Sequence, residues 1–134
     1  MIEFAMAATV LIVFLFGTIE FGRMIWERNI VANASKAGVR WAVVRGNSSG
    51  QTPATEDQVE DYVRSWMYGI PVTVTTTWCT TAFTNGVCQP PATSNNKPGS
   101  TVQVVVQGSF TPVVPLLPPN TITLRSAAQM IIAR

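Results

Sequence analysis

Residues 4–19 read Phe4-Ala-Met-Ala-Ala-Thr-Val-Leu-Ile-Val-Phe-Leu-Phe-Gly-Thr-Ile19 and contain no charged side chain, and Glu3 stands directly before them. We call this run the apolar stem. Roughly 20 apolar residues span the core of a bilayer, so the stem is close to membrane length. A helical pattern continues past it to about Arg45 without a proline. Forty-five helical residues would measure about 67 Å, so the second half of this helix must be covered by protein. The pattern predicts a subunit that leaves lipid and packs against copies of itself.

Charged residues stand at both ends of the apolar stem. An unpaired charge is very costly in apolar surroundings, so a buried Glu3 would need a cation such as the terminal amine of its own or a neighbouring subunit. The alternative is an acid at headgroup level with no special partner. Glu20 and Arg23 are helical neighbours. They are either a contact between helices of a filament core or an ordinary interface pair at the membrane edge.

The helix is expected to form residues 1–46, a membrane and filament-core segment, and to end at the loop that starts with Gly46. Apolar residues recur beyond the stem at steps of three and four, as in a helix with one buried face. They are Ile25, Trp26, Ile30, Val31, Ala34, Ala37, Trp41 and Val44.

Residues 47–134 are expected to form one globular domain. Thr55 and Gln58 have the spacing of a capping box, and Gly69 is a stop signal, which predicts a helix over 56–68. Its expected buried face is Val59, Tyr62, Val63, Trp66 and Met67.

Alternation and β-branched residues further along this domain predict three strands, at about 71–78, 101–110 and 121–134. An exposed loop is expected over 89–100. Strands that follow one another without helices between them should pair antiparallel. The predicted fold class is therefore α+β: a long N-terminal helix packed on a small antiparallel sheet, with one short helix. Apolar residues expected to pack on the long helix are Val72, Val74, Trp78, Val102, Val104, Ile122 and Leu124.

The distribution of charge argues against an enzyme. All seven acidic residues precede Tyr62, and the chain has no histidine. General acid–base catalysis needs a side chain that titrates near the working pH, and His or carboxylate ligands are needed for most metals. The sequence therefore predicts no catalytic residue, no metal site and no cofactor. A net charge of +2 with 12% charged residues gives no electrostatic footprint for nucleic acid.

Cys79 and Cys88 enclose eight residues that include Asn85-Gly86, a strong turn signal. An even cysteine count beside an export-type stem favours a disulfide between them in an oxidising compartment. A pair of free thiols in a reduced domain is the alternative. The spacing is not Cys-x-x-Cys, which argues against a redox centre.

Three segments resemble the TadE/TadG-like pilin family of tight-adherence (Flp) pilus systems. They are Glu3-Phe4-Ala5, Gly17-Thr-Ile-Glu20-Phe-Gly-Arg23, and the Asn29–Ala42 stretch, and the pattern Phe110-Thr-Pro-Val-Val-Pro-Leu-Leu117 with its flanking strands is similar too. The resemblance implies a type IV pilin-like protein, processed by a prepilin peptidase and assembled through its N-terminal helix. It implies assembly roles for Glu3, Phe4, Glu20, Phe21 and Arg23.

Precursors of that family carry a short basic leader, and the mature acid is commonly the fifth residue. Here the acid is Glu3 and no basic leader precedes it, so we expect either a mature or trimmed form or a different processing. The cations after the stem, Arg23, Arg28, Lys36, Arg40 and Arg45, would by themselves place the C-terminal domain in the cytoplasm. A basic leader that has been removed would reconcile these cations with an extracellular domain. The two cysteines also favour an extracellular position of the C-terminal domain.

We therefore expect a subunit of an extracellular, cell-surface filament that resides in the inner membrane before assembly. Its expected partners are further copies of itself, the prepilin peptidase and the pilus assembly machinery. The alternatives are a minor pilin or assembly component, and a membrane-anchored surface binding module. Asn47-Ser48-Ser49 also fits an N-glycosylation acceptor.

Overall fold

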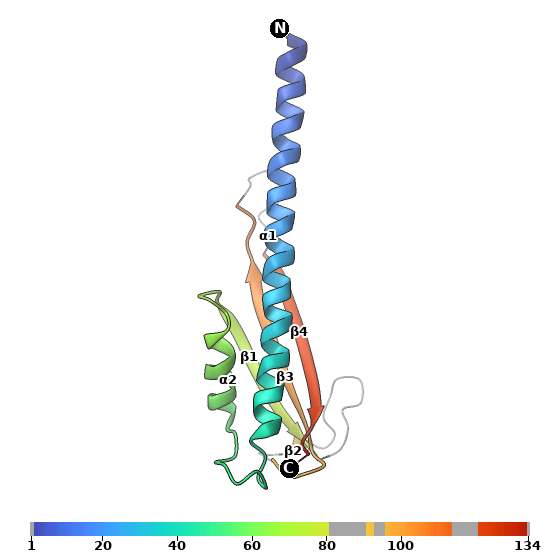
Figure 1. Cartoon of the computed structure of the whole chain (residues 1–134). Helices are drawn as coiled ribbons and strands as arrows, with labels where there is room; N and C mark the ends of the chain where they lie inside the picture. The colour runs from blue at the N-terminus through green and yellow to red at the C-terminus, as the bar shows by residue number, and fades with distance from the viewer. Residues whose placement is uncertain (1, 81–90, 93–95, 114–120, 134) are drawn as a thin grey trace.

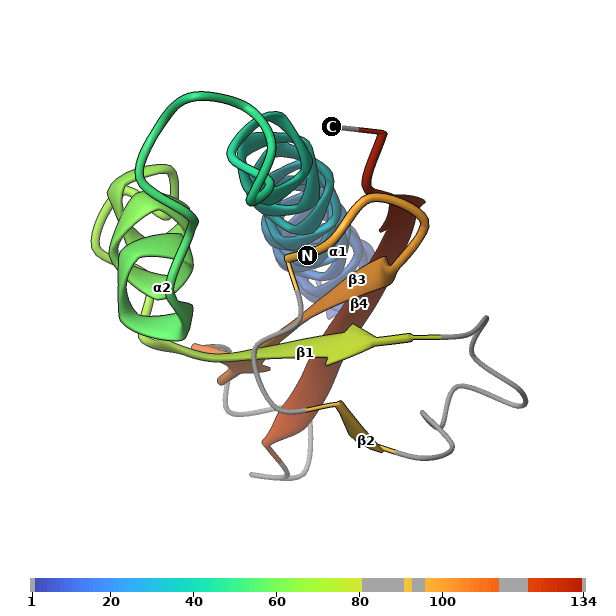
Figure 2. The same ribbon diagram turned by 90° about the horizontal axis from the view of Figure 1, so that it is seen from below.

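The structure is a computed structural model that describes residues 2–80, 91–92, 96–113 and 121–133. Its elements follow the order α1, α2, β1, β2, β3 and β4 along the chain, and both helices lie on one face of the sheet (Figures 1 and 2). Their bounds are α1 Ile2–Val44, α2 Glu56–Ser65, β1 Val72–Cys79, β2 Pro91–Ala92, β3 Thr101–Phe110 and β4 Ile122–Ile131. The predicted α+β fold class is confirmed.

Helix α1 is a continuous rod of 43 residues, about 65 Å long. Its second half packs on β3, β4 and α2, while its first half extends beyond the sheet (Figure 1). The residues that it buries in the domain recur at helical spacing and are small or β-branched: Val31, Ala34, Ser35, Gly38, Val39 and Ala42. Of the apolar stripe expected from the sequence, Ile25, Trp26 and Val44 are exposed, so fewer of its residues are buried than predicted.

At Gly38, α1 lies close to both α2 and the sheet. A Cβ atom at this position would clash with the side chain of Val63 and would lie 3.4 Å from Cγ1 of Val104. Glycine therefore lets α1 settle into the groove between α2 and the sheet.

Helix α2 begins with the predicted capping box. The backbone N–H of Gln58 donates to Thr55 Oγ1 and that of Thr55 donates to Gln58 Oε1, both at 3.4 Å. The helix ends at Ser65, earlier than residue 68. Trp66 was expected on its buried face but is 45% exposed, because it follows the last helical turn and packs only its edge against Tyr62.

The sheet is antiparallel, with strand order β2-β1-β3-β4. The strand predicted at 101–110 is found with those bounds. The strand predicted at 71–78 is found one residue later, and the strand predicted at 121–134 is shorter at both ends. Pairs such as Val74↔Val106 and Val104↔Ala128 align the apolar side chains that face α1. Ile122 was expected in the core but is 42% exposed, at the start of β4, which has a neighbouring strand on one side only.

The segment 89–100 is not the fully exposed loop that the sequence predicted. It contains β2, which pairs with Trp78 and Cys79 of β1. Asn96 is buried, and its side-chain amide donates to the carbonyl of Ala54 at 2.6 Å. The described part of this segment therefore contacts both β1 and the chain between α1 and α2.

Candidate functional site

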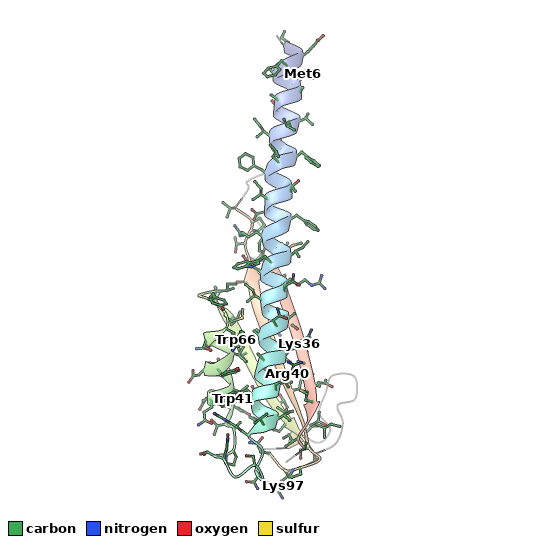
Figure 3. All side chains as sticks on the ribbon, viewed as in Figure 1. Met6, Lys36, Arg40, Trp41, Trp66 and Lys97 are labelled. Atoms are coloured by element: carbon green, nitrogen blue, oxygen red, sulfur yellow. The ribbon has the colours of Figure 1, made fainter. Side chains whose placement is uncertain are left out.

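The apolar stem has no cover from the described part of its own chain. Every side chain over residues 4–19 is exposed except that of Ala8, which is half-buried. Phe4, Val10 and Phe14 are more than 70% exposed, and Met6 lies near the free end (Figure 3). Among the described residues, α1 is the one helix long and apolar enough to cross a membrane, by length and composition. The stem is thus a surface that needs lipid or protein around it.

Helix α1 meets the segment after β3 at the base of the stem. Glu20 is 6% exposed, and its Oε1 accepts a hydrogen bond from the backbone N–H of Val113 at 3.0 Å. One turn along, Nη2 of Arg23 donates to the carbonyl oxygen of Thr111 at 2.6 Å. Both contacts join a side chain of α1 to the backbone of the chain that leaves the sheet. We call Glu20, Arg23 and the residues they hold the basal clamp.

Charges and an aromatic ring complete the basal clamp around Arg23. Its guanidinium lies 3.6 Å from the carboxylate of Glu20 and 3.5 Å from that of Glu27, and 4.7 Å from the ring centre of Phe110. These contacts with two carboxylates, a carbonyl oxygen and an aromatic ring hold the guanidinium of Arg23 in one orientation. The basal clamp therefore marks where α1 stops being part of the domain and the uncovered stem begins.

The five predicted assembly residues do not form one cluster. Glu20 and Arg23 meet in the basal clamp and contact their own chain. Phe21 is 59% exposed on the same turn of α1. Glu3 and Phe4 lie at the far end of the stem, and both are exposed.

Two further predicted sites lie in or near the loops. Cys79 is fully buried at the end of β1 and is not a free thiol, but Cys88 lies outside the described residues, so the bridge between them stays a prediction. Asn47 is exposed, and its backbone N–H donates to the carbonyl of Asn96 at 2.7 Å. An exposed side chain on an anchored backbone is compatible with the glycosylation motif. Within the described ranges, no group of three or more His, Cys, Asp or Glu side chains could hold a metal.

The sequence did not point to the partners of Glu20 and Arg23 in the basal clamp. Their contacts with Val113 and Thr111 cross 93 and 88 positions of the chain and go to backbone atoms, which leave no trace in side-chain patterning. The pair of Arg23 with Glu27 does follow from the sequence and is confirmed, because the two residues stand at the spacing of helical ion pairs.

Comparison with curated proteins and with solved structures finds no match. Residues 1–40 match the family model described as TadE-like protein. The matched segment contains the whole apolar stem, the α1 residues of the basal clamp and most of the α1 surface that packs on the sheet. This family is pilus-associated and structural, which is in keeping with a membrane-associated or cell-surface pilus component. The match confirms the resemblance found in the sequence: the N-terminal helix of this chain is similar to that of the TadE-like family.

Proposed function

We propose that this protein is a pilin, the structural subunit of an extracellular type IV-like (Tad-type) filament that polymerises through α1. The observation that carries the proposal is the uncovered stem. Its 16 residues, together with the exposed Ile2 before them, present large apolar side chains on all sides. Burying one such side chain contributes about 1.5–3 kcal/mol, so a stem left in water would be strongly unfavourable.

Lipid would cover the stem before assembly, and copies of the stem would cover it afterwards. The helix over residues 2–19 is about 27 Å long, close to the roughly 30 Å of a bilayer core. Small residues in it, among them Ala5, Ala8 and Gly17, allow neighbouring helices to approach closely. The proposal includes the inner membrane as the surroundings before assembly, and a prepilin peptidase and the pilus assembly machinery as partners, as the resemblance to the pilin family implies.

Glu3 would then be buried among apolar stems and would need a cation. A neighbour's terminal amine is the proposed partner, which would set the axial position of each new subunit. An unpaired buried carboxylate is costly, so a new subunit would be stable only at the axial position where Glu3 meets this amine.

The remainder of the domain is proposed to be a non-catalytic coat. From Tyr62 onward the sequence has no carboxylate side chain and no imidazole, so groups for acid–base chemistry are lacking there. Thr, Ser, Asn and Gln residues of this part supply a hydrogen-bonding surface suited to solvation or attachment.

A minor pilin or assembly component is the second candidate, because the family match supports both roles equally. Abundance separates them. Filaments sheared from cells that make this chain should be imaged and analysed by mass spectrometry. This chain as the dominant species, with its helices in the filament core, supports the subunit role. A few copies per filament would support the minor role, and filaments without the chain would overturn both.

A further inference from the structure

The face of α1 turned away from the sheet carries two neighbouring cations. Lys36 and Arg40 are both exposed and stand one turn apart on α1 (Figure 3). They lie on the side of the helix opposite the buried Ala34 and Gly38. We call this surface the basic face. From residue 28 to the end of α1 the sequence has no acid that could neutralise it.

Helix α2 carries the opposite arrangement. Asp57 and Asp61 are both exposed and stand one turn apart, on the side of α2 opposite the buried Val59 and Val63. We call this surface the acidic face. The ion pair within α2 joins Arg64 to Glu60 and does not involve Asp57 or Asp61.

Within one chain neither face is neutralised. In the part of the chain that the structure describes, the ion pairs join Arg23 to Glu20 and Glu27, and Arg64 to Glu60. Like charges at a spacing of four destabilise a helix by a few tenths of a kcal/mol per pair. Each helix thus carries a small cost that a partner of opposite charge would remove.

The two faces also match in spacing and lie on different sides of the subunit. In both helices the paired charges are four residues apart, about 6 Å along the axis, so two helices laid side by side can form two ion pairs together. Helix α2 flanks α1 (Figure 2). Its acidic face lies on the side of α2 opposite the residues that this helix buries in the core, Val59 and Val63. One subunit therefore cannot close this contact on itself, whereas a second copy can.

An apolar part accompanies the charges. A hollow of about 520 Å³ between α1 and α2 is lined by Arg40, Val44 and Trp66, among others, and Val44 and Trp66 are 66% and 45% exposed. Tryptophan and arginine side chains are enriched at the centres of protein interfaces. The basic face thus has the mixed composition of a contact surface and differs from a uniformly solvated helix side.

We propose that the basic face of α1 in one subunit binds the acidic face of α2 in a neighbouring copy. Lys36 and Arg40 pair with Asp57 and Asp61, and Trp66 and Val44 border the contact. The contact is heterologous, since the two surfaces differ, and repeated heterologous contacts build open helical polymers. The inference rests on the proposed function, because it names the lateral contact between assembled copies.

The first test places the photoreactive residue p-benzoylphenylalanine at position 44, next to the basic face, in the full chain. Isotopically light and heavy copies are expressed together in one membrane, irradiated and digested, so that adducts between copies can be distinguished by mass. The expected product joins position 44 of one copy to residues 56–65 of another. The same probe at the exposed position 125 of β4 is the control and should give no adduct with α2. Absence of the position-44 adduct would overturn the inference, even if filaments form.

The second test exchanges the charges. K36D/R40D and D57K/D61K should each lower filament yield and, with the probe present, adduct yield by roughly tenfold, because like charges then face each other. The fourfold variant with both changes should recover to within about threefold of the parent. K97D/R125D makes the same change in net charge on exposed cations elsewhere and should have little effect.

These two tests also separate the inference from the proposed function. An adduct between position 44 and α2 without any filament would support the contact and contradict the filament. The contact would be overturned if K97D/R125D lowered the filament yield as much as K36D/R40D does. It would also be overturned if the fourfold variant did not restore the yield. In both cases the proposal of a filament would stand.

Discussion

The carboxylate of Glu20 in α1 accepts a hydrogen bond from the backbone N–H of Val113 at 3.0 Å, although 93 positions separate the two residues. This bond fastens the chain that leaves β3 to the helix at the level where the sheet ends. Below it, α1 is one layer of the domain, and above it α1 is the bare stem. This specific contact therefore lies at the division between the folded domain and the uncovered stem.

Removing the carboxylate of Glu20 should loosen this junction. In Glu20→Ala the N–H of Val113 loses its acceptor and Arg23 loses one of its two acids, which should cost about 1–3 kcal/mol of unfolding free energy. Glu20→Gln is the matched control, because its amide oxygen can still accept the bond. Amide hydrogen exchange at Val113 in detergent is the measurement. Equal protection in the alanine variant and the parent would show that the bond is not important for this segment.

Loss of the apolar stem should give a soluble monomer. A deletion of residues 2–19 removes the uncovered apolar surface and ends before Glu20, so the basal clamp is retained. Light scattering of the purified protein without detergent checks its mass, and circular dichroism checks its folding. If the shortened chain still formed filaments, α1 would not be the polymerisation element.

Glu3→Ala should reduce assembly far more than Glu56→Ala. Both side chains are exposed in the single subunit, but under the proposed function only Glu3 loses solvent when copies assemble. Breaking a buried charge pair on one side costs roughly 3–5 kcal/mol, whereas an exposed acid contributes little. The readout is the yield of sheared filaments at equal expression. The same yield from both variants would rule out the pairing role.

A disulfide between Cys79 and Cys88 should hold the segment after β1 against the sheet. Closing so short a loop contributes about 2–3 kcal/mol in the chain-entropy model. Labelling of thiols in denatured, unreduced protein tests it, with reduced protein as the positive control. No label is expected before reduction, and two labels per chain would show that the bridge is absent.

Gly38→Ala should destabilise the domain, because a methyl group at this position clashes with Val63. The expected loss is about 1–3 kcal/mol, the usual cost of overpacking a core. Gly22→Ala is the matched control in the same helix: nothing lies within 4 Å of its added methyl group, and its higher helix propensity should stabilise slightly. Thermal unfolding in detergent compares the two. Equal midpoints would show that α2 moves aside without cost.

Much of the architecture could be read from local patterns. The capping residues Thr55 and Gln58 start α2 as expected, since their interaction depends only on residues three positions apart. The strand Thr101–Phe110 was found because it is rich in valine and bounded by turn residues. The long helix was evident from its composition and the absence of proline.

Features set by tertiary contacts could not be read in this way. Periodicity placed Trp66 and Ile122 in the core, but Trp66 follows the last turn of α2 and Ile122 starts the edge strand β4, and both side chains are exposed. The two-residue strand β2 has no local signal and exists because β1 offers it a partner. For the candidate site, the sequence singled out Glu20 and Arg23 but not the backbone groups of Thr111 and Val113 to which they bind.

The continuity of α1 has a mechanical consequence. Because stem and domain share one helix without a proline or a break from Ile2 to Val44, the subunit behaves as a lever about 65 Å long. A tilt of about 5° at the stem would displace the opposite end by about 6 Å on that length. Under the proposed function, the sheet domain should therefore be displaced by small changes in how the stems of neighbouring copies pack, so that pulling or twisting of the filament core would move its outer surface.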